Sequence, residues 1–383
     1  MTESTEVLIA GAGIGGLTAA LTLHATGVRS TVVESARELQ PLGVGINLLP
    51  HAVRELAELG LSDELARLAA EPVAISFFDD GGELMFSEPR GIAGGYAWPQ
   101  YSVHRGHLQM LLLSAVRDRL GPEAVRTGMG LTGFDARDGH VTAHTAAGDV
   151  EARILVGADG LHSVVRGQLH QGPDPLMWSG VRMYRGAAEM PAFLDGRTMA
   201  IVKGADGIDL ITYPIGDGLV NWVVQVPESA PGPLPGDAGW NAPVDPDAVR
   251  GHLADWRLEW LDAADMVVRT ATVLEYPMVD RDPLPWWGRD NVTLLGDAAH
   301  PMYPVGANGG SQAIVDARVL ANELHGDPDG GLRAYENDRR AATADVIAAN
   351  RKMHQSALTL SPEDLAEITA TYRSDTDADR TTA

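Results

Sequence analysis

Three glycines near the N-terminus, Gly11, Gly13 and Gly16, have the spacing of a loop that binds a dinucleotide. In such a loop the first glycine permits a tight turn, the second lets the backbone approach a pyrophosphate, and the third lets the following helix pack closely. Free N–H groups at the start of that helix attract the phosphates. Glu34, which follows the next apolar run, supplies a carboxylate that can accept hydrogen bonds from both hydroxyls of a ribose. The pattern therefore predicts a dinucleotide-binding site.

A second match to the same spacing, formed by Gly128, Gly130 and Gly133, is interpreted as a chance match. It is flanked by Arg126 and by Phe134, and no helical pattern follows it. We therefore expect one glycine-rich loop and no separate domain for a nicotinamide nucleotide.

Two further motifs place an aspartate at the end of an apolar run. Asp159 stands in GADGLHSVVR (157–166), and Asp297 stands in LLGDAAHP (294–301). In open α/β sheets, ligands bind at the carboxyl ends of strands, where an aspartate can accept hydrogen bonds from sugar hydroxyls. Read alone, each aspartate could equally form a turn or cap a helix.

The elements that must hold these motifs follow from the apolar periodicity. Strands over 7–10 and 30–34 flank a helix over 13–26, which makes a βαβ unit. Two more buried strands are expected at 153–157 and 291–296. Further helices are expected at 51–71, 106–120, 309–324 and 332–354. The motif-bearing strand ends should therefore meet at one edge of a parallel sheet.

The middle of the chain, over 176–279, has mainly strand patterns, as do residues 73–87. The clearest hairpin joins 208–215 to 219–226 through a Gly-Asp-Gly turn. In its second arm Trp222 shares one face with three valines, and Asn221 and Gln225 lie on the other. A proline-rich loop follows, and then a helical pattern over 247–265. The chain thus predicts an α/β nucleotide domain, built from three pieces, with an inserted antiparallel sheet.

Composition excludes several classes of protein. The 383 residues contain 52 Asp and Glu against 29 Lys and Arg, and the net charge of −23 would repel nucleic acid. The cations are scattered and no apolar run is long enough to cross a bilayer, so no membrane contact is expected. The lack of cysteine excludes disulfides and thiolate chemistry, and the histidines lack metal-binding spacings, so we expect no metal. The first residues lack the cationic region of a signal peptide, which predicts a cytoplasmic location.

The three motifs GAGIGG (11–16), GADGLHSVVR (157–166) and LLGDAAHPMYPVGANGG (294–310), in this order, resemble the single-component FAD-dependent aromatic hydroxylases, the group A flavoprotein monooxygenases. The resemblance runs over nearly the whole chain and is greatest to the members that hydroxylate 5-methylphenazine-1-carboxylate in phenazine biosynthesis. It rests further on the stretches PLGVGIN (41–47), SEPRG (87–91), PQYSVHRGHLQM (99–110), YPMVDRDPLPWWGR (276–289) and YPVGANGGSQAI (303–314).

The resemblance implies an α/β (mixed α+β) fold like that of p-hydroxybenzoate hydroxylase. A Rossmann-like FAD-binding domain would comprise 1–72, 102–175 and 280–360. A β-sheet domain that binds the substrate would comprise 73–101 and 176–279, and residues 361–383 would form a C-terminal tail.

The implied reaction uses FAD, NADH or NADPH, and O2. The nucleotide reduces the flavin, oxygen adds at flavin C4a, and the hydroperoxide delivers one oxygen atom to an electron-rich ring carbon. The cofactor carries this chemistry and the protein supplies placement and electrostatics. The partner would be a small aromatic substrate of antibiotic biosynthesis, bound by a monomer or a homodimer.

The resemblance also assigns roles to side chains. Glu34 would hold the adenosine ribose, Arg105 and Gln109 would reach the pyrophosphate and ribityl region, Asp297 would hold a ribityl hydroxyl, and Asp159 would serve both FAD and the pyridine nucleotide. Arg166 would support the loop around Asp159, and a helix N-terminus after Gly306 would face the N1–C2 edge of the flavin. The full set of expected cofactor residues is Gly11, Gly13, Ile14, Gly15, Gly16, Glu34, Ser35, Gly45, Arg105, Gln109, Leu131, Asp159, Asp297, Gly306, Asn308, Gly309 and Gly310.

No side chain is expected to act as a nucleophile, because the flavin performs the chemistry. Candidate pocket residues are Arg185, Tyr213, Trp222, Pro301 and Tyr303, with Tyr184, Met183, Met199 and Met302 as further lining. Arg182 and Arg185 should diverge, so that one enters the pocket and could hold a substrate carboxylate. Arg185 could instead contact flavin or pair with a protein carboxylate.

The chain departs from the family pattern at two places. Many relatives have Gly-Gln-Gly in the last loop, where this chain reads ANGGSQ (307–312), and they often have Trp-Arg-Gly where this chain has Tyr184-Arg185-Gly186. The resemblance implies a planar phenazine-like aromatic substrate, with or without a carboxylate. Because the chain departs from the family pattern, another polycyclic or phenolic precursor is an alternative substrate. A non-oxygenating flavin reductase and a flavin carrier without turnover are the remaining alternatives, since the tryptophan motif and active-site lysine of flavin halogenases are missing.

Overall fold

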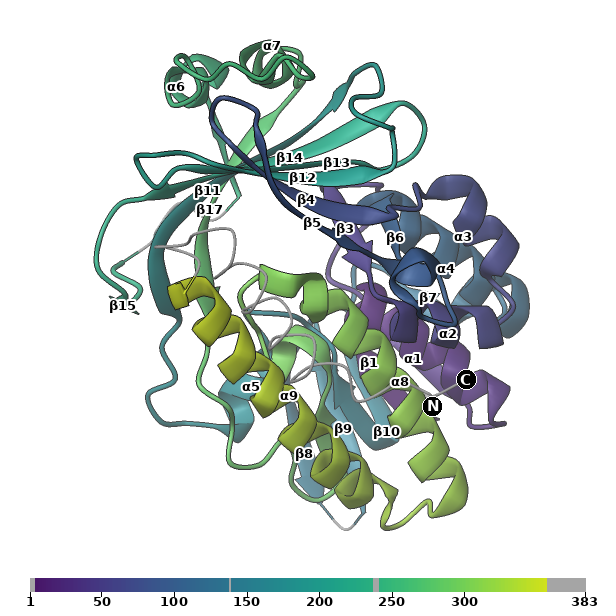
Figure 1. Cartoon of the computed structure of the whole chain (residues 1–383). Coiled ribbons are helices and arrows are strands. Elements are labelled where there is room, and N and C mark those ends of the chain that lie inside the picture. Colours follow the sequence, from purple (N-terminus) through teal and green to yellow (C-terminus); the bar gives the residue numbers. More distant parts are fainter. Residues whose placement is uncertain (1–3, 138, 237–240, 357–383) are drawn as a thin grey trace.

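The computed structural model describes residues 4–137, 139–236 and 241–356, which form two lobes, each built on one large sheet (Figure 1). The expected tail at 361–383 lies outside the described residues. None of the helices in the described part is both long and apolar enough to cross a membrane.

The first lobe contains a sheet of seven described strands. Five of them run parallel in the order β7, β2, β1, β10 and β18, and β9 and β8 continue from β10 in antiparallel pairing. The bounds are β1 Ser4–Ala10, β2 Ser30–Val33, β7 Val125–Arg126, β8 Leu131–Arg137, β9 His140–Thr145, β10 Gly148–Gly157 and β18 Val292–Leu294. The three predicted motif strands, β1, β10 and β18, are thus neighbours, and their carboxyl ends lie at one edge, as expected.

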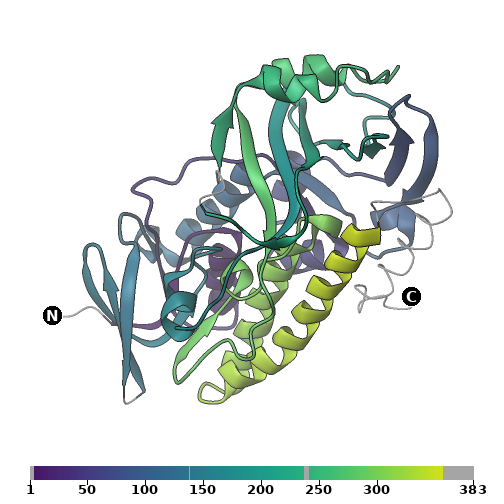
Figure 2. The same ribbon diagram turned by 90° about the vertical axis from the view of Figure 1, so that its left-hand side faces the viewer.

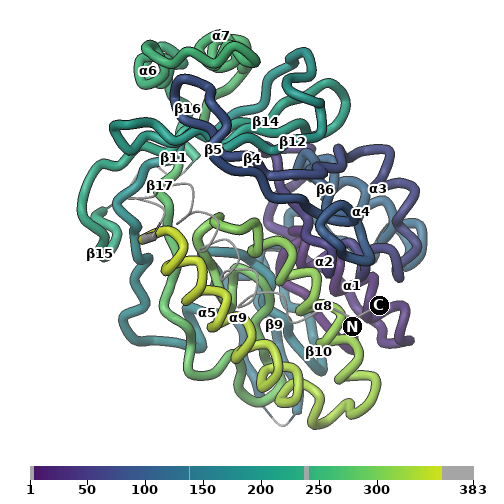
Figure 3. The backbone as a smooth tube through the Cα atoms, in the orientation of Figure 1, coloured from purple at the N-terminus to yellow at the C-terminus, as the bar shows by residue number. Residues whose placement is uncertain are grey.

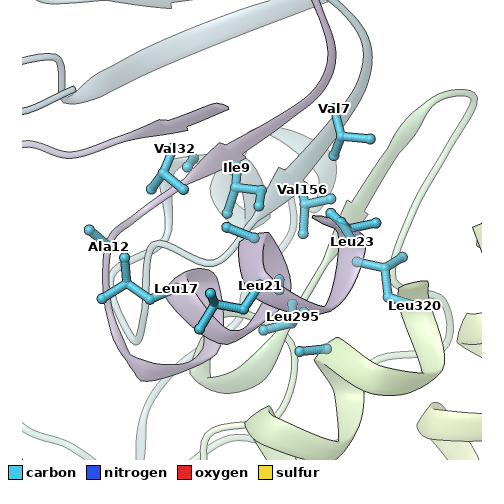
Figure 4. Packing of buried hydrophobic residues seen from close by; sticks show 14 of the residues in the cluster. Val7, Ile9, Ala12, Leu17, Leu21, Leu23, Val32, Val156, Leu295 and Leu320 are labelled. Carbon is cyan, nitrogen blue, oxygen red and sulfur yellow. The ribbon is translucent and has the colours of Figure 1, made fainter. Parts of the chain in front are cut away.

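Helices cover this sheet and bury its apolar side chains. Leu17 and Leu21 of α1 pack among Ile9, Leu295 and Leu320, which come from β1, the end of β18 and α8 (Figure 4). The segments α1 and α8 lie side by side although almost three hundred residues separate them (Figure 3). The helices of this lobe are α1 Ile14–Ala25, α2 Pro50–Glu58, α3 Ser62–Leu68, α4 Arg105–Leu120, α5 Val164–Leu169, α8 Asn308–Gly326 and α9 Gly331–Ser356.

The helix expected over 51–71 is two helices, α2 and α3. Gly60 adopts φ +71°, a left-handed conformation that ends the first helix and that glycine tolerates best. The short strands β3 (Gly45–Leu48) and β6 (Tyr101–His104) pair with each other beside these helices and face the second lobe. The rejected glycine match leads into strand β8 and no helix, in agreement with that interpretation.

The second lobe contains a sheet of nine described strands in the order β16, β17, β11, β14, β13, β12, β4 and β5, with β15 beside β11. The predicted hairpin is present, with Tyr213 opposite Asn221. The sheet is antiparallel except for β12 and β4, which run parallel and correct the expectation of a fully antiparallel sheet. The reason is that β4 arrives from a separate segment, so no hairpin sets its direction. The bounds are β4 Ala74–Asp79, β5 Leu84–Pro89, β11 Met177–Glu189, β12 Thr198–Lys203, β13 Asp209–Pro214, β14 Leu219–Pro227, β15 Gly232–Pro233, β16 Ala242–Val244 and β17 Val273–Asp280.

This nine-stranded sheet has two distinct faces. Helices α6 (Pro246–Gly251) and α7 (Ala263–Val268) cover the face that carries Trp222, here called the outer face (Figure 1). The inner face carries Arg185, Tyr213 and Asn221 and looks onto β3 of the first lobe. The helical stretch expected over 247–265 is therefore two short helices with an irregular connection.

Helix α9 runs from the first lobe up to the second (Figure 2). Arg339 on α9 donates to Asp316 of α8, and Arg351 near the other end of α9 forms a bidentate ion pair with Asp280 of β17. The helix therefore ties the two lobes together. The expected domain boundaries stay a prediction, although the segments 74–89 and 177–280 supply the strands of the second sheet.

Candidate functional site

The glycine-rich loop follows β1, and packing accounts for two of its three glycines. A Cβ on Gly11 would lie 2.4 Å from the carbonyl oxygen of Ala158, and a Cβ on Gly16 would lie 2.0 Å from the carbonyl oxygen of Gly11. A Cβ on Gly13 would meet no protein atom within 4 Å. The open space beside Gly13 is what the close approach of a pyrophosphate to the backbone requires.

The peptide of Ala12 in this loop is held at both ends. Its N–H donates to Glu34 Oε2 at 2.8 Å, and its carbonyl oxygen accepts from Gln109 Nε2 at 2.7 Å. Glu34 Oε1 also accepts from the N–H of Ala36 at 2.8 Å and from Ser35 Oγ at 2.9 Å. Glu34 therefore shapes the loop in addition to any bond that it makes to a ribose, and Gln109 has the same second role.

Asp159, just after β10, orders the junction between this strand and the following loop, and its expected role toward FAD and the pyridine nucleotide stays a prediction. Its carboxylate accepts from Ser163 Oγ at 2.5 Å and from the N–H groups of Val164 and Val165 at 2.7 and 3.3 Å. Burial raises the pKa of Asp159, against these hydrogen bonds, which lower it.

Arg166 supports this region, as expected, and its side chain is 2% exposed. It pairs with Asp174 at 2.6 and 2.9 Å and donates to the carbonyl oxygens of Ala298 and Ala299 at 3.1 and 2.9 Å. Since the two carbonyls belong to the LLGDAAHP motif, Arg166 joins the second motif to the third.

The third motif forms a turn at the end of β18 that brings Asp297 next to the start of α8. The Asp297 side chain is exposed, and a Cβ on Gly309 would lie 4.0 Å from Asp297 Oδ1. Gly306 and Ala307 both have positive φ, 70° and 61°. Asn308 is 1% exposed. Asp297 therefore lies next to the residues that follow Gly306, as expected. The left-handed backbone conformation of Ala307 is strained, because Ala307 has a Cβ atom.

The inner face presents a cation, Arg185, that no carboxylate of the described residues neutralises. Within the described chain Arg185 forms no ion pair; Nη2 donates to the carbonyl oxygen of Gly45 at 3.5 Å, and the guanidinium lies 5.4 Å from the ring centroid of Tyr276. Its Nε is buried without a hydrogen-bond partner. Burial lowers the pKa of Arg185, and nearby Arg105 lowers it further. The alternative in which Arg185 pairs with a protein carboxylate is therefore wrong for the described chain.

Polar side chains around Arg185 fix β3 against the inner face. Asn221 Oδ1 accepts from the N–H of Gly45 at 2.7 Å, and a Cβ on Gly45 would lie 2.6 Å from Asn221 Cβ. Burial raises the pKa of Tyr213 to about 12, although Arg185 and a hydrogen bond with Asn47 oppose the increase. Tyr213 is thus a neutral hydroxyl next to a buried cation.

Trp222 and Tyr184, expected to line the pocket, lie on the outer face. Trp222 is fully buried, and its Nε1 donates to Thr270 Oγ1 at 2.8 Å, while the ring of Tyr184 stacks on His252. Neighbouring residues of a strand point to opposite faces, so neither shares the face of Arg185. Arg182 also lies there and pairs with Glu228, which agrees with the expected divergence of the two arginines.

The remaining pocket candidates lie between the lobes. Pro301 is buried, and Tyr303 packs with Met183 and Met278 of the inner face. Burial raises the pKa of Tyr303 to about 12, with Asp280 adding to the increase. Met199 packs with Tyr213 on the same inner face.

Other expected cofactor residues have ordinary structural surroundings. Arg105 is exposed at the start of α4, and Leu131 begins β8 and packs against the core of the first lobe. A Cβ on Gly15 would lie 2.7 Å from a terminal methyl of Leu295, and one on Gly310 would lie 2.6 Å from the terminal methyl of Ile46, so a larger residue at either position would have to displace that side chain. Ile14 is a core residue. The structure does not distinguish a ligand role for these residues.

Sequence reasoning missed a buried ionic group behind the third motif, made of His300, Asp316 and Arg339. Asp316 falls among Ile314, Ala317 and Leu320, on the apolar stripe of α8, and a charge there was the available signal. It also missed Tyr276 and Asn47, although both lie in stretches that carry the family resemblance, PLGVGIN (41–47) and YPMVDRDPLPWWGR (276–289). Within the described residues no group of three or more His, Asp or Glu side chains could hold a metal ion.

Comparison with known proteins agrees with this geometry. Residues 4–350 match the family model described as FAD binding domain. The chain is 45% identical to phenazine 1,6-dicarboxylic acid hydroxylase PhzS of Lysobacter antibioticus, with 97% of each chain covered. It is 36% identical to 3-hydroxybenzoate 6-hydroxylase 1 of Aquipseudomonas alcaligenes, over 90% of this chain and 88% of that one.

The fold is similar to that of Klebsiella pneumoniae HpxO complexed with FAD and uric acid, with a TM-score of 0.79 at 25% identity, over 97% of this chain and 93% of that one. The open space at Gly13, the clamped Ala12 peptide and the adjacent Asp297 and Gly309 fit an FAD molecule that spans the carboxyl ends of β1, β10 and β18. The chain therefore belongs to the FAD-binding family of flavin-dependent aromatic hydroxylases and is an FAD-dependent monooxygenase.

Proposed function

We propose that the enzyme uses NADH or NADPH and O2 to hydroxylate a planar, phenazine-like aromatic acid. The observation that carries the substrate class is Arg185 on the inner face, which is half-buried, keeps its Nε buried without a hydrogen-bond partner and has no carboxylate partner within the described residues. A partly desolvated cation that lacks a carboxylate partner is costly, and a substrate carboxylate that binds it as a bidentate partner would reduce that cost. The relative of 45% identity, whose name describes a hydroxylase of a phenazine dicarboxylic acid, supports the same class.

The side chains of the first lobe would bind and orient FAD. Glu34 would hold the adenosine ribose, Gly13 would admit the pyrophosphate, Arg105 and Gln109 would lie beside it, and Asp297 would hold the ribityl chain. The start of α8 would direct its N–H groups toward the flavin. When bound, FAD would supply the redox chemistry by which electrons of the pyridine nucleotide reduce O2, so that one oxygen atom enters the aromatic ring and the other leaves as water.

The inner face would hold the substrate beside the flavin. Met183, Met278 and Tyr303, which pack together between the lobes, would form an apolar wall beside a flat ring and would exclude water. Arg185 would fix the carboxylate end of the ring, and the neutral Tyr213 hydroxyl would donate or accept a hydrogen bond next to it. This arrangement orients the ring, and no side chain needs to act as a nucleophile.

The test is substrate-stimulated oxidation of NADH with product mass analysis. Phenazine-1-carboxylate, its N-methylated form and phenazine-1,6-dicarboxylate are compared with unsubstituted phenazine. We expect the carboxylated rings to accelerate flavin reduction and to gain one oxygen atom. If no phenazine is oxygenated whereas a phenol is, the substrate class is wrong and the monooxygenase assignment stands.

A second candidate is a monooxygenase of another polycyclic or phenolic precursor, which the 36% identity to a hydroxybenzoate hydroxylase favours. Adding 3-hydroxybenzoate and a quinolone to the same panel separates the two candidates. A non-oxygenating reductase would consume NADH without an oxygenated product from any of these compounds.

The placement of FAD has its own test. A leucine at position 13 would fill the open space beside the loop, so the Gly13→Leu protein should be isolated without the yellow cofactor. A Gly13→Leu protein that keeps stoichiometric FAD would overturn the assignment.

A further inference from the structure

One buried carboxylate, Asp316 of α8, holds both ends of the turn that carries Asp297. Asp316 Oδ2 accepts from the N–H of Gly296 at 3.0 Å and from His300 Nε2 at 2.5 Å. Its Oδ1 accepts from Arg339 Nε at 2.7 Å. A carboxylate only accepts, so His300 carries its proton on Nε2. The residue before Asp297 and a residue shortly after it are therefore fixed by a single side chain.

The group is closed to solvent. Asp316 is 0% exposed, His300 is 2% exposed and Arg339 is 6% exposed. Burial alone would raise the pKa of Asp316, but His300 and Arg339 lower it to about 2, so the carboxylate is charged. Desolvation of such a group costs several kcal/mol, and an apolar side chain could fill the same volume. Stability alone does not explain the choice of an ionic group at this position.

The position of Asp316 in the fold explains why an ionic group is present there. Asp316 lies on the same helix whose first residue, Asn308, follows the strained Gly306–Ala307 pair. Because the carboxylate holds the Asp297 turn and the helix body together, the Asp297 carboxylate and the first N–H groups of α8 keep one relative position. Gln312, one turn earlier on α8, also bonds Arg339 and continues the connection toward the helix start.

We propose that Asp316 is a positioning residue that aligns Asp297 and the N-terminus of α8 on the ribityl and flavin parts of FAD. By this alignment it sets the affinity for FAD and the reduction potential of the flavin. The proposal rests on the FAD placement given in the proposed function. It concerns a residue that touches no ligand and that acts through the turn.

The test replaces Asp316 by Asn together with Arg339 by Met, so that no unpaired buried cation remains. In metal sites, removal of a side chain that orients a ligand weakens binding about 10- to 100-fold. We expect at least a tenfold higher dissociation constant for FAD, measured by flavin fluorescence on titration of the apoprotein. The midpoint potential of the bound flavin should become more negative, because the helix N-terminus faces the reduced anion less directly.

A matched control separates positioning from loss of a buried carboxylate. Glu336 of α9 is half-buried and accepts from Thr293 Oγ1 at 3.0 Å and from the N–H of Trp287 at 3.3 Å, outside the turn of residues 296–300. Glu336→Gln should lower the melting temperature. Its dissociation constant for FAD should stay within twofold of the wild-type value, and the midpoint potential of its bound flavin should equal that of the wild type within experimental error. His300→Gln keeps an N–H donor for Asp316 and should retain affinity, whereas His300→Phe should weaken it.

Three results decide the proposal. If the double variant folds and binds FAD with unchanged affinity and potential, Asp316 is only structural and the proposal is wrong. If the double variant does not fold, the pair His300→Gln and His300→Phe gives the decision, and equal affinities and potentials in both overturn the proposal. Asp297→Asn serves as the direct-contact reference: if it leaves FAD affinity unchanged, the FAD placement itself is wrong, whatever the Asp316 variants show.

Discussion

The two faces of the nine-stranded sheet are built from the same strands and satisfy their polar groups in opposite ways. On the outer face the indole N–H of Trp222 has a protein partner in Thr270, and Arg182 is paired with Glu228. On the inner face Arg185 keeps a buried Nε without a partner and a charge without a carboxylate within the described chain. The outer face is not fully satisfied either, since the indole N–H of Trp260 is buried without a partner, but its cation Arg182 has a carboxylate partner and the inner-face cation Arg185 has none within the described residues.

The contrast teaches how a binding surface differs from a core surface of equal burial. Both faces carry aromatic and methionine side chains, so apolar content does not separate them. The separation comes from polar groups, because a folding core pairs every buried charge. We therefore interpret Arg185, a half-buried cation without a carboxylate partner in the described chain, as a residue that binds a ligand, and the following variants test this interpretation.

The largest change in the free energy of unfolding is expected from a substitution on the outer face. Trp222→Ala removes a fully buried indole and leaves Thr270 without its donor, so the free energy of unfolding should fall by about 3–5 kcal/mol. Urea unfolding measures this change. Folded protein at low temperature should bind the aromatic substrate with near wild-type affinity, and a loss of affinity comparable to that of an Arg185 variant would erase the distinction between the faces.

Arg185→Met on the inner face should weaken substrate binding without lowering the free energy of unfolding, which is the reverse of the result expected for Trp222→Ala. Loss of a charged hydrogen-bond partner costs about 1.5–3 kcal/mol, so the dissociation constant for a carboxylated aromatic should rise roughly 10- to 150-fold. Unfolding stability should not fall, because a desolvated cation is removed. Arg182→Met is the matched control on the outer face, and equal losses of affinity in both variants would contradict the carboxylate assignment.

A pH-dependent effect is expected from Tyr213. Its pKa of about 12 lies above the value near 10 of an unfolded chain, so the native protein holds a proton that the unfolded chain releases between these values. The associated stability is present below pH 10 and is lost as pH rises through 12. Tyr213→Phe should lose about 1 kcal/mol at neutral pH with its bond to Asn47. It should also flatten the alkaline loss of stability, measured by denaturant unfolding from pH 8 to 11; an unchanged slope would mean that Tyr213 is not buried.

The smallest effect concerns the turn that opposes the inner face. Val305, next to this turn, packs on the inner-face cluster, and Ala307 has φ 61°, which costs an L-residue energy that glycine avoids. Ala307→Gly should raise the free energy of unfolding by about 0.5–1 kcal/mol. Thermal unfolding measures the gain. A decrease would show that Ala307 is not left-handed in solution.

The sequence predicted the cofactor side far better than the substrate side. Strand β1, helix α1 and the ends of β10 and β18 were expected within a few residues, because a glycine loop needs a strand before it and a helix after it. Alternation along β14 correctly separated Trp222 from Asn221. It could not tell which of the two faces the first lobe, because a period of two is symmetric and both faces are covered.

The other differences between the sequence-based expectations and the structure have separate physical causes. The helical patterns over 51–71 and 247–265 each contain a break that apolar periodicity does not register, as at Gly60. The parallel pairing of β4 with β12 depends on the path of a distant segment. The partners of Glu34 and Asp316 are backbone groups or residues far along the chain, and a single sequence does not show them.

The first lobe joins elements that are far apart along the chain: β1 pairs with β10, β10 pairs with β18, and α1 packs on α8. This arrangement has a consequence for the synthesis of the protein. The glycine loop leaves the ribosome early, but the strands and the helix that complete its surroundings end near residue 326. At synthesis rates of about 5–20 residues per second, roughly 15–60 s separate these events. During this interval the nascent chain exposes the apolar edges of β1 and α1, which chaperones can recognise. We therefore expect FAD to bind only late in translation or after it, once the chain has been made to about residue 326 of 383.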